Sequence, residues 1–117
     1  MHETYTPLTL GEFIAALDAL GDQAQVRGLN GDIRSYRGYY ERNATAPCDL
    51  VHHADFLAQE YRREVGKDLF GWKGGTFTAS VDEMIYYADI GETGPQIVGF
   101  RRGDDGVYEL ILVKEVW

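Results

Sequence analysis

The chain has 117 residues, of which 44% are hydrophobic and 13% aromatic, and 19 acidic against 11 basic side chains give it a net charge of −8. This length suits one domain over residues 1–117, the apolar content can fill a core, and the negative charge disfavours long DNA or RNA as partners. The chain has no apolar run of the roughly 20 residues that cross a membrane, no secretory signal pattern, and a single cysteine, Cys48. We therefore expect a cytoplasmic domain that has no disulfide framework and does not bind membranes.

Two amphipathic helices are predicted. The first covers about 9–20, where Thr9 and Glu12 have the spacing of a capping box and Gly21 can end the helix. The second covers 49–65, with Asp49 as its N-cap and Gly66 at its C-terminal end. The apolar stripes expected to face the core are Leu10, Phe13, Ile14, Leu17 and Leu20 in the first, and Val51, Ala54, Leu57, Ala58, Tyr61 and Val65 in the second.

The remaining segments are predicted to be strands and turns. The candidate strands are 25–28, 35–46, 77–79, 84–88, 96–101 and 107–116, the last two forming a terminal hairpin around the turn Gly103–Gly106. Because strands come in runs with the helices between them, we expect an α+β fold with a mainly antiparallel sheet of about five or six strands and two helices packed on it. An exposed edge on the terminal hairpin would need covering, which predicts a homo-oligomer.

The stretch Ser35-Tyr36-Arg37-Gly38-Tyr39-Tyr40 is the first candidate site. It lies in a segment, residues 27–42, that holds four arginines against two acidic residues, so its local charge is +2 and the rest of the chain carries −10. In a strand, Ser35, Arg37 and Tyr39 would share one face, and Gly38 would mark a bulge or a close approach by a ligand. The alternative is a half-buried strand in which Arg37 pairs with a carboxylate of the protein.

The stretch Phe70-Gly71-Trp72-Lys73-Gly74-Gly75-Thr76-Phe77-Thr78 is the second candidate site. Its glycines can turn backbone N–H groups toward an anion, and Lys73 adds a positive charge. The stretch is not a Walker A loop, because the Gly-Lys-Ser/Thr sequence is missing. A plain glycine-rich turn is the alternative interpretation.

Together the two motifs resemble a family of small proteins encoded by tailed phages. Members of that family show a Ser-aromatic-Arg-Gly-x-Tyr stretch, a helix, and then an aromatic-Lys-Gly-Gly-x-aromatic stretch, and the resemblance covers roughly residues 8–100. The tail 103–117 is less typical of the family. The resemblance implies a site at these residues in a protein of the host cell cytoplasm, and it implies no particular activity.

The positions of the histidines and of the single cysteine do not favour a metal site or a catalytic nucleophile. His52 and His53 are adjacent, so on a helix they would point about 100° apart and could not hold one metal together. Cys48 has no partner histidine that the sequence identifies, and a small buried hydrophobe is its default role. We therefore expect no catalytic residue, no metal and no cofactor.

These observations favour a non-catalytic binding protein for a small anionic, nucleotide-derived ligand, and, by analogy with other phage proteins, an anti-defence sponge that sequesters an immune signal nucleotide. The alternative is an acidic interaction module that inhibits a host protein, and the third reading is a small metal-dependent nucleotide hydrolase. The residues expected to bind the phosphorylated ligand are Ser35, Tyr36, Arg37, Tyr39, Trp72, Lys73, Gly74, Gly75 and Thr76.

Overall fold

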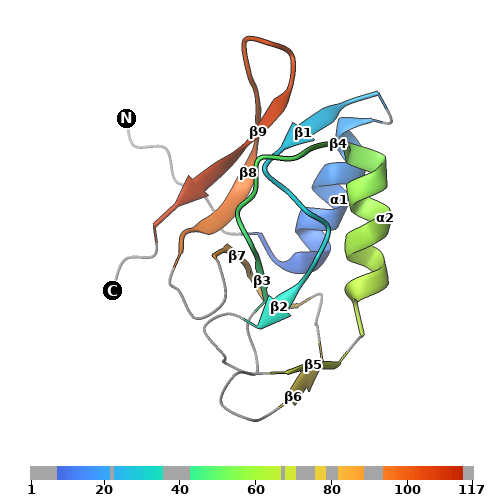
Figure 1. Ribbon diagram of the computed structural model, residues 1–117, viewed down its shortest axis with the longest axis vertical. Helices are drawn as coiled ribbons and strands as arrows, with labels where there is room; N and C mark the ends of the chain where they lie inside the picture. The colour runs from blue at the N-terminus through green and yellow to red at the C-terminus, as the bar shows by residue number, and fades with distance from the viewer. Residues whose placement is uncertain are drawn as a thin grey trace.

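A seven-stranded sheet forms the frame of the computed structural model, which describes residues 8–21, 23–35, 43–66, 68–70, 76–78, 82–88 and 94–114 (Figure 1). The sheet has the order β2-β3-β7-β8-β9-β1-β4, and β5 pairs with β6 in a separate two-stranded sheet. The strands are β1 Gln25–Arg27, β2 Arg34–Ser35, β3 Asn43–Thr45, β4 Val51–His53, β5 Asp68–Phe70, β6 Thr76–Thr78, β7 Ile85–Tyr87, β8 Gln96–Arg102 and β9 Tyr108–Val113. The β3–β7 and β1–β9 pairs are parallel and the others antiparallel, so the expected α+β class with a mainly antiparallel sheet is confirmed.

Helix α1, Leu10–Leu20, begins and ends where its local sequence signals predict. The Thr9 hydroxyl accepts a hydrogen bond from the Glu12 N–H at 3.2 Å, and the Glu12 carboxylate accepts one from the Thr9 N–H at 3.0 Å. This is the capping box, which satisfies two N–H groups that the helix itself cannot. At the other end Gly21 adopts a φ of 96°, which favours glycine.

Helix α2, Ala54–Glu64, starts five residues later than expected, and Asp49 is not its cap. Residues Val51–His53 instead form β4, which pairs antiparallel with β1, and His53 is the N-cap without a side-chain cap hydrogen bond. Pairing with β1 therefore takes precedence over the helical pattern here. Val51 is consequently 40% exposed instead of lying on the buried stripe of the helix.

The expectation of one continuous strand over 35–46 is wrong. The structure has two short strands there, β2 and β3, which pair antiparallel with Ser35 opposite Asn43, so the chain reverses between them. The sequence between them contains Gly38, which weakens the interior of a strand. Strand β5 was not predicted, and it pairs with β6 with Phe70 opposite Thr76.

The main core lies between the two helices and one face of the sheet. Phe13 of α1 and Tyr61 of α2 are fully buried, and their ring centroids are 5.0 Å apart in an edge-to-face arrangement. The sheet contributes fully buried side chains from three strands: Val26, Ile85 and Ile97. On the opposite face Tyr86 is also buried, and its hydroxyl lies 3.2 Å from Nε2 of the buried Gln96.

The order of the strands differs from the expectation that the terminal hairpin stands at the edge of the sheet. Strand β9 pairs with β1 at Tyr108, which places β2 and β4 at the two ends of the sheet order. The β1–β9 ladder has that single pair among the described residues, so β1 does not cover the rest of β9, and the homo-oligomer stays a prediction. Among the described residues, no helix is long and apolar enough to span a membrane.

Candidate functional site

Most of the predicted ligand-binding residues lie outside the described part of the chain. Only Ser35, at the end of β2, and Thr76, at the start of β6, are described, and both are placed by backbone pairing. The others named from the sequence, which lie outside the described residues, are Tyr36, Arg37, Tyr39, Trp72, Lys73, Gly74 and Gly75.

The described ends of the two motifs lie at one end of the molecule. Ser35, the first residue of the first motif, is paired with Asn43, which follows that motif, and Phe70 and Thr76 of the second motif are paired with each other. Strand β2 also contacts β5, although the two belong to different sheets. Figure 1 shows β2, β5 and β6 together at the end of the molecule opposite the β8–β9 turn.

A buried polar network fixes the backbone on both sides of the first motif. The Thr45 hydroxyl, in β3, lies 2.9 Å from the Tyr61 hydroxyl and donates to the Asn30 side-chain carbonyl at 3.1 Å. Asn30 Oδ1 also accepts from the Asp32 N–H at 2.9 Å, an Asx turn that directs the chain toward β2. Burial, which disfavours the phenolate, raises the pKa of Tyr61 far above its ordinary value despite its hydrogen bonds with Thr45 and Gly31. Tyr61 therefore remains a neutral structural group that joins α2 to β3.

A second tyrosine joins β7 to the segments that follow β1 and β3. The Tyr87 hydroxyl donates to the Gly28 carbonyl at 2.7 Å and accepts from the Cys48 N–H at 3.4 Å. Burial raises the pKa of Tyr87 above its ordinary value. Gly28 has a φ of 98°, and a Cβ there would lie 2.9 Å from the Tyr87 hydroxyl oxygen, so the contact requires glycine.

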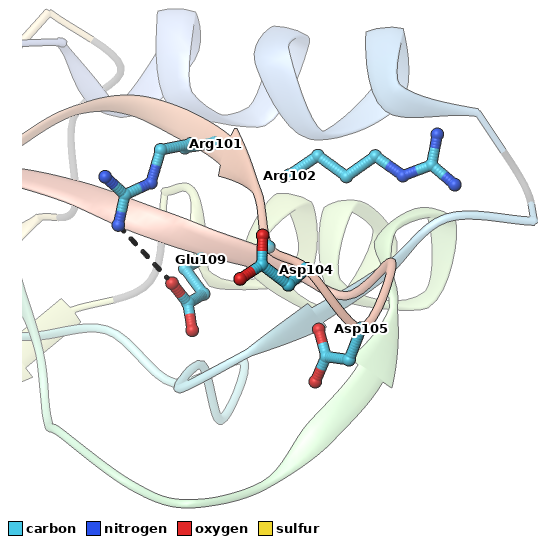
Figure 2. A pocket seen from close by; sticks show the side chains of 6 residues that line it. Arg101, Arg102, Asp104, Asp105 and Glu109 are labelled. Atoms are coloured by element: carbon cyan, nitrogen blue, oxygen red, sulfur yellow. Dashed lines mark ion pairs between the residues drawn. The ribbon is translucent and has the colours of Figure 1, made fainter.

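The β8–β9 turn carries an open pocket at the other end of the molecule (Figure 2). It has a volume of about 590 Å³ and is lined by Arg101, Arg102, Gly103, Asp104, Asp105 and Glu109. Figure 2 shows the side chains of Arg101 and Arg102 pointing in opposite directions, and Arg101 pairs with Glu109 at 3.6 Å. The two guanidinium groups therefore do not converge on one anion.

Arg27 belongs to the basic segment 27–42 in the sequence, but in the structure its side chain forms ion pairs with the β8–β9 hairpin. Its guanidinium lies 3.0 Å from Asp105 and 3.5 Å from Glu109. Bonds from the Val107 N–H and from Arg27 lower the pKa of the Asp105 carboxyl below its ordinary value. The charge of Arg27 therefore belongs to the β8–β9 hairpin, so the +2 counted for residues 27–42 does not all lie at the first motif.

The structure shows which polar groups the sequence pattern missed. Asn30 and Thr45 were not identified, and Tyr61 was predicted only as a member of the apolar stripe. Asn30-Gly31-Asp32 is nevertheless a turn signal that could have indicated the amide of Asn30. The Arg27–Asp105 pair joins residues 78 positions apart, a separation at which no local pattern identifies partners. Within the described ranges, no group of three His, Cys, Asp or Glu residues is arranged to hold a metal ion.

Comparisons with protein-family models, with curated proteins and with solved structures found no match. The resemblance to a tailed-phage family therefore stays a prediction from the two motifs.

Proposed function

We propose that this protein binds a small anionic, nucleotide-derived ligand without converting it. The site would be formed by the two motifs, Ser35–Tyr40 and Gly71–Phe77. One observation supports this: the described ends of both motifs lie together, since Ser35 pairs with Asn43, Phe70 pairs with Thr76, and β2 contacts β5. Two motifs that are separated by a helix in the sequence thus have anchor points at the same end of the molecule.

Different residue types of the two motifs would contact different parts of a nucleotide. Arg37 can hold a phosphate through two parallel N–H groups, and Lys73 adds a second positive charge. The backbone N–H groups at Gly74 and Gly75 can donate to phosphate oxygens, and Ser35 and Thr76 can add hydroxyls. The aromatic residues Tyr36, Tyr39 and Trp72 can stack on a base. This inventory contains binding groups and no nucleophile with an assigned base, which favours binding over turnover.

A biological role follows if the resemblance to tailed-phage proteins is correct. A phage protein that binds a nucleotide tightly and does not convert it would lower the free concentration of a host signal. We propose on this ground that the protein sequesters an immune signal nucleotide.

The test is a thermal-shift and calorimetric screen against linear and cyclic nucleotides. A ligand at about 100 times its Kd stabilises the folded state by about 2.7 kcal/mol, which a melting curve resolves. Arg37→Ala and Lys73→Ala should each weaken binding at least about tenfold. Arg102→Ala removes an exposed arginine at the opposite end of the molecule and should leave binding unchanged. The proposal fails if no nucleotide stabilises the folded protein, or if the double variant R37A/K73A binds as tightly as the unaltered chain.

The acidic interaction module is the second candidate, and the net charge of −8 favours it. A surface of this charge would steer a basic host protein toward it and would bind more weakly as salt is added. R37A/K73A separates the two candidates, because it should leave capture of a basic host protein intact while nucleotide binding is lost.

A further inference from the structure

Strand β4, Val51–His53, is an outer strand of the sheet with half of its backbone hydrogen-bonding groups unused by β1. The Gly28 N–H donates to the Leu50 carbonyl and the Ala54 N–H donates to the Ala24 carbonyl, both at 2.8 Å. Because alternate residues of a strand bond to the same neighbour, the N–H and C=O of Val51 and the N–H of His53 point away from β1. The strand also contains no lysine, proline or bulge that would prevent pairing.

Exposed apolar side chains surround this edge. Leu50 is 52% exposed, Val51 40% and Phe56 44%, so three of the five large exposed hydrophobic residues among the described positions lie within seven residues. The Phe56 ring packs on the His52 imidazole, with the two ring centroids 5.0 Å apart, on the helix side of the sheet. Alternation then places Leu50 on the same side as His52, and Val51 on the opposite side.

We propose that two copies of this chain associate through their β4 edges, antiparallel about a two-fold axis that passes through Val51. In this register Val51 of each copy exchanges two backbone hydrogen bonds with Val51 of the other, and the two sheets join into one. Leu50 of one copy lies opposite His52 of the second and covers its His52–Phe56 ring pair. The exposed apolar surface of each copy is thereby buried by the same surface of the other.

Charge complementarity selects this register and favours a second copy as the occupant. With Val51 at the axis, Asp49 of each copy faces His53 of the other, and an imidazole N–H can donate to the carboxylate. The neighbouring register, centred on His52, would pair Val51 with His53, whose carbonyl is the N-cap carbonyl of α2 and accepts the first bond of that helix. Asp49 would then face no strand residue, because residue 55 lies in α2. The edge can thus use all of its outward backbone groups and pair Asp49 with His53 in only one of the two registers. This inference goes beyond the proposed ligand binding and does not depend on it.

The first test is the oligomeric state by sedimentation equilibrium and light scattering, with folding verified by circular dichroism. The unaltered chain should be a dimer at micromolar concentration, and Val51→Lys should raise the dimer Kd at least about tenfold, because it places two ammonium groups at the axis. Leu50→Ser with Phe56→Ser should do the same without altering the strand backbone. Leu112→Lys changes a residue of similar exposure, 38%, on β9 and should leave the dimer intact. A monomer at every concentration, or a dimer that V51K does not weaken, overturns the proposal.

The second test fixes the register by disulfide formation in a Cys48→Ser background. In the proposed register the two Val51 Cα atoms are about 5.5 Å apart, within the range of about 4.4–6.8 Å that a disulfide spans. Val51→Cys should therefore oxidise to a covalent dimer. His52→Cys should not, because its counterpart lies two residues along the strand, beyond the roughly 7 Å that a disulfide reaches. Faster cross-linking through residue 52 than through residue 51 overturns the register.

Discussion

Gly31 lies where the chain turns from β1 toward β2, at a position that leaves no room for a side chain. Its φ is +84°, and a Cβ there would lie 2.9 Å from Cβ of Glu60 in α2. Gly31→Ala should therefore lower the free energy of unfolding for two reasons. The left-handed backbone conformation should cost about 1–2 kcal/mol, and the steric overlap with Glu60 should cost about 1–3 kcal/mol. Urea denaturation measures the sum.

Gly66, at the C-terminal end of α2, provides the control, because it isolates the backbone contribution. Its φ is +85°, close to that of Gly31, and a Cβ there would meet nothing within 4 Å. Gly66→Ala should cost only about 1–2 kcal/mol. If the two variants lose equal stability, Gly31 and Glu60 are not in contact.

Tyr61 illustrates how much of a residue's role the sequence predicts. Helical spacing placed it on the apolar stripe, and the structure confirms that it is fully buried. Periodicity predicts the direction of the side chain, and it does not indicate that the hydroxyl meets Thr45, which is 16 residues away in a separate strand. The predicted Gly66 terminus, in contrast, was correct because a φ of 85° depends on the residue itself.

The β8–β9 hairpin is an element whose turn depends on the ionisation of Asp105. The Asp105 Oδ1 accepts from the Val107 N–H at 3.0 Å, and Oδ2 accepts from Arg27 at 3.0 Å. Since these bonds lower its pKa, the folded chain binds fewer protons there than the unfolded chain does. The stabilisation is present above the unfolded pKa, about 3.9, and is lost as the pH falls through the lower folded pKa.

Asp105→Asn should therefore reduce the melting temperature at neutral pH, and the difference from the unaltered chain should shrink as the pH is lowered below the unfolded pKa of about 3.9. The Asn side chain can still accept from the Val107 N–H, so this variant removes chiefly the charge that faces Arg27. Asp104→Asn removes a carboxylate from the same turn and is the control. Equal pH dependence in D104N and D105N would contradict this role of Asp105.

The two helices show which element boundaries the sequence can predict. The start of α1 depends on Thr9 and Glu12, three residues apart, so the signal is local and the prediction was correct. The start of α2 depends on β1, because the Ala54 N–H bonds to the Ala24 carbonyl 30 residues earlier. The same long-range pairing turned Val51 from an expected core residue into an exposed edge residue. A helix boundary that is set by pairing between distant segments can therefore be identified only once the arrangement of the strands in the sheet is known.

The molecule as a whole combines a charge of −8 with an apolar edge, and this combination makes the salt response of the proposed dimer a diagnostic. Two copies of like charge repel at long range, whereas the Val51 backbone pair and the Leu50–Phe56 contact are uncharged. Raising the salt from about 10 mM to about 150 mM shortens the Debye length from about 30 Å to about 8 Å and screens the repulsion. The dimer Kd should therefore fall as salt is added, although the two Asp49–His53 pairs are weakened.

Sedimentation equilibrium at the two salt concentrations measures this change in the dimer Kd, and His53→Ala separates the contribution of the Asp49–His53 pairs. An interface held chiefly by ion pairs would respond in the opposite direction, so a dimer that dissociates with salt would contradict association through β4.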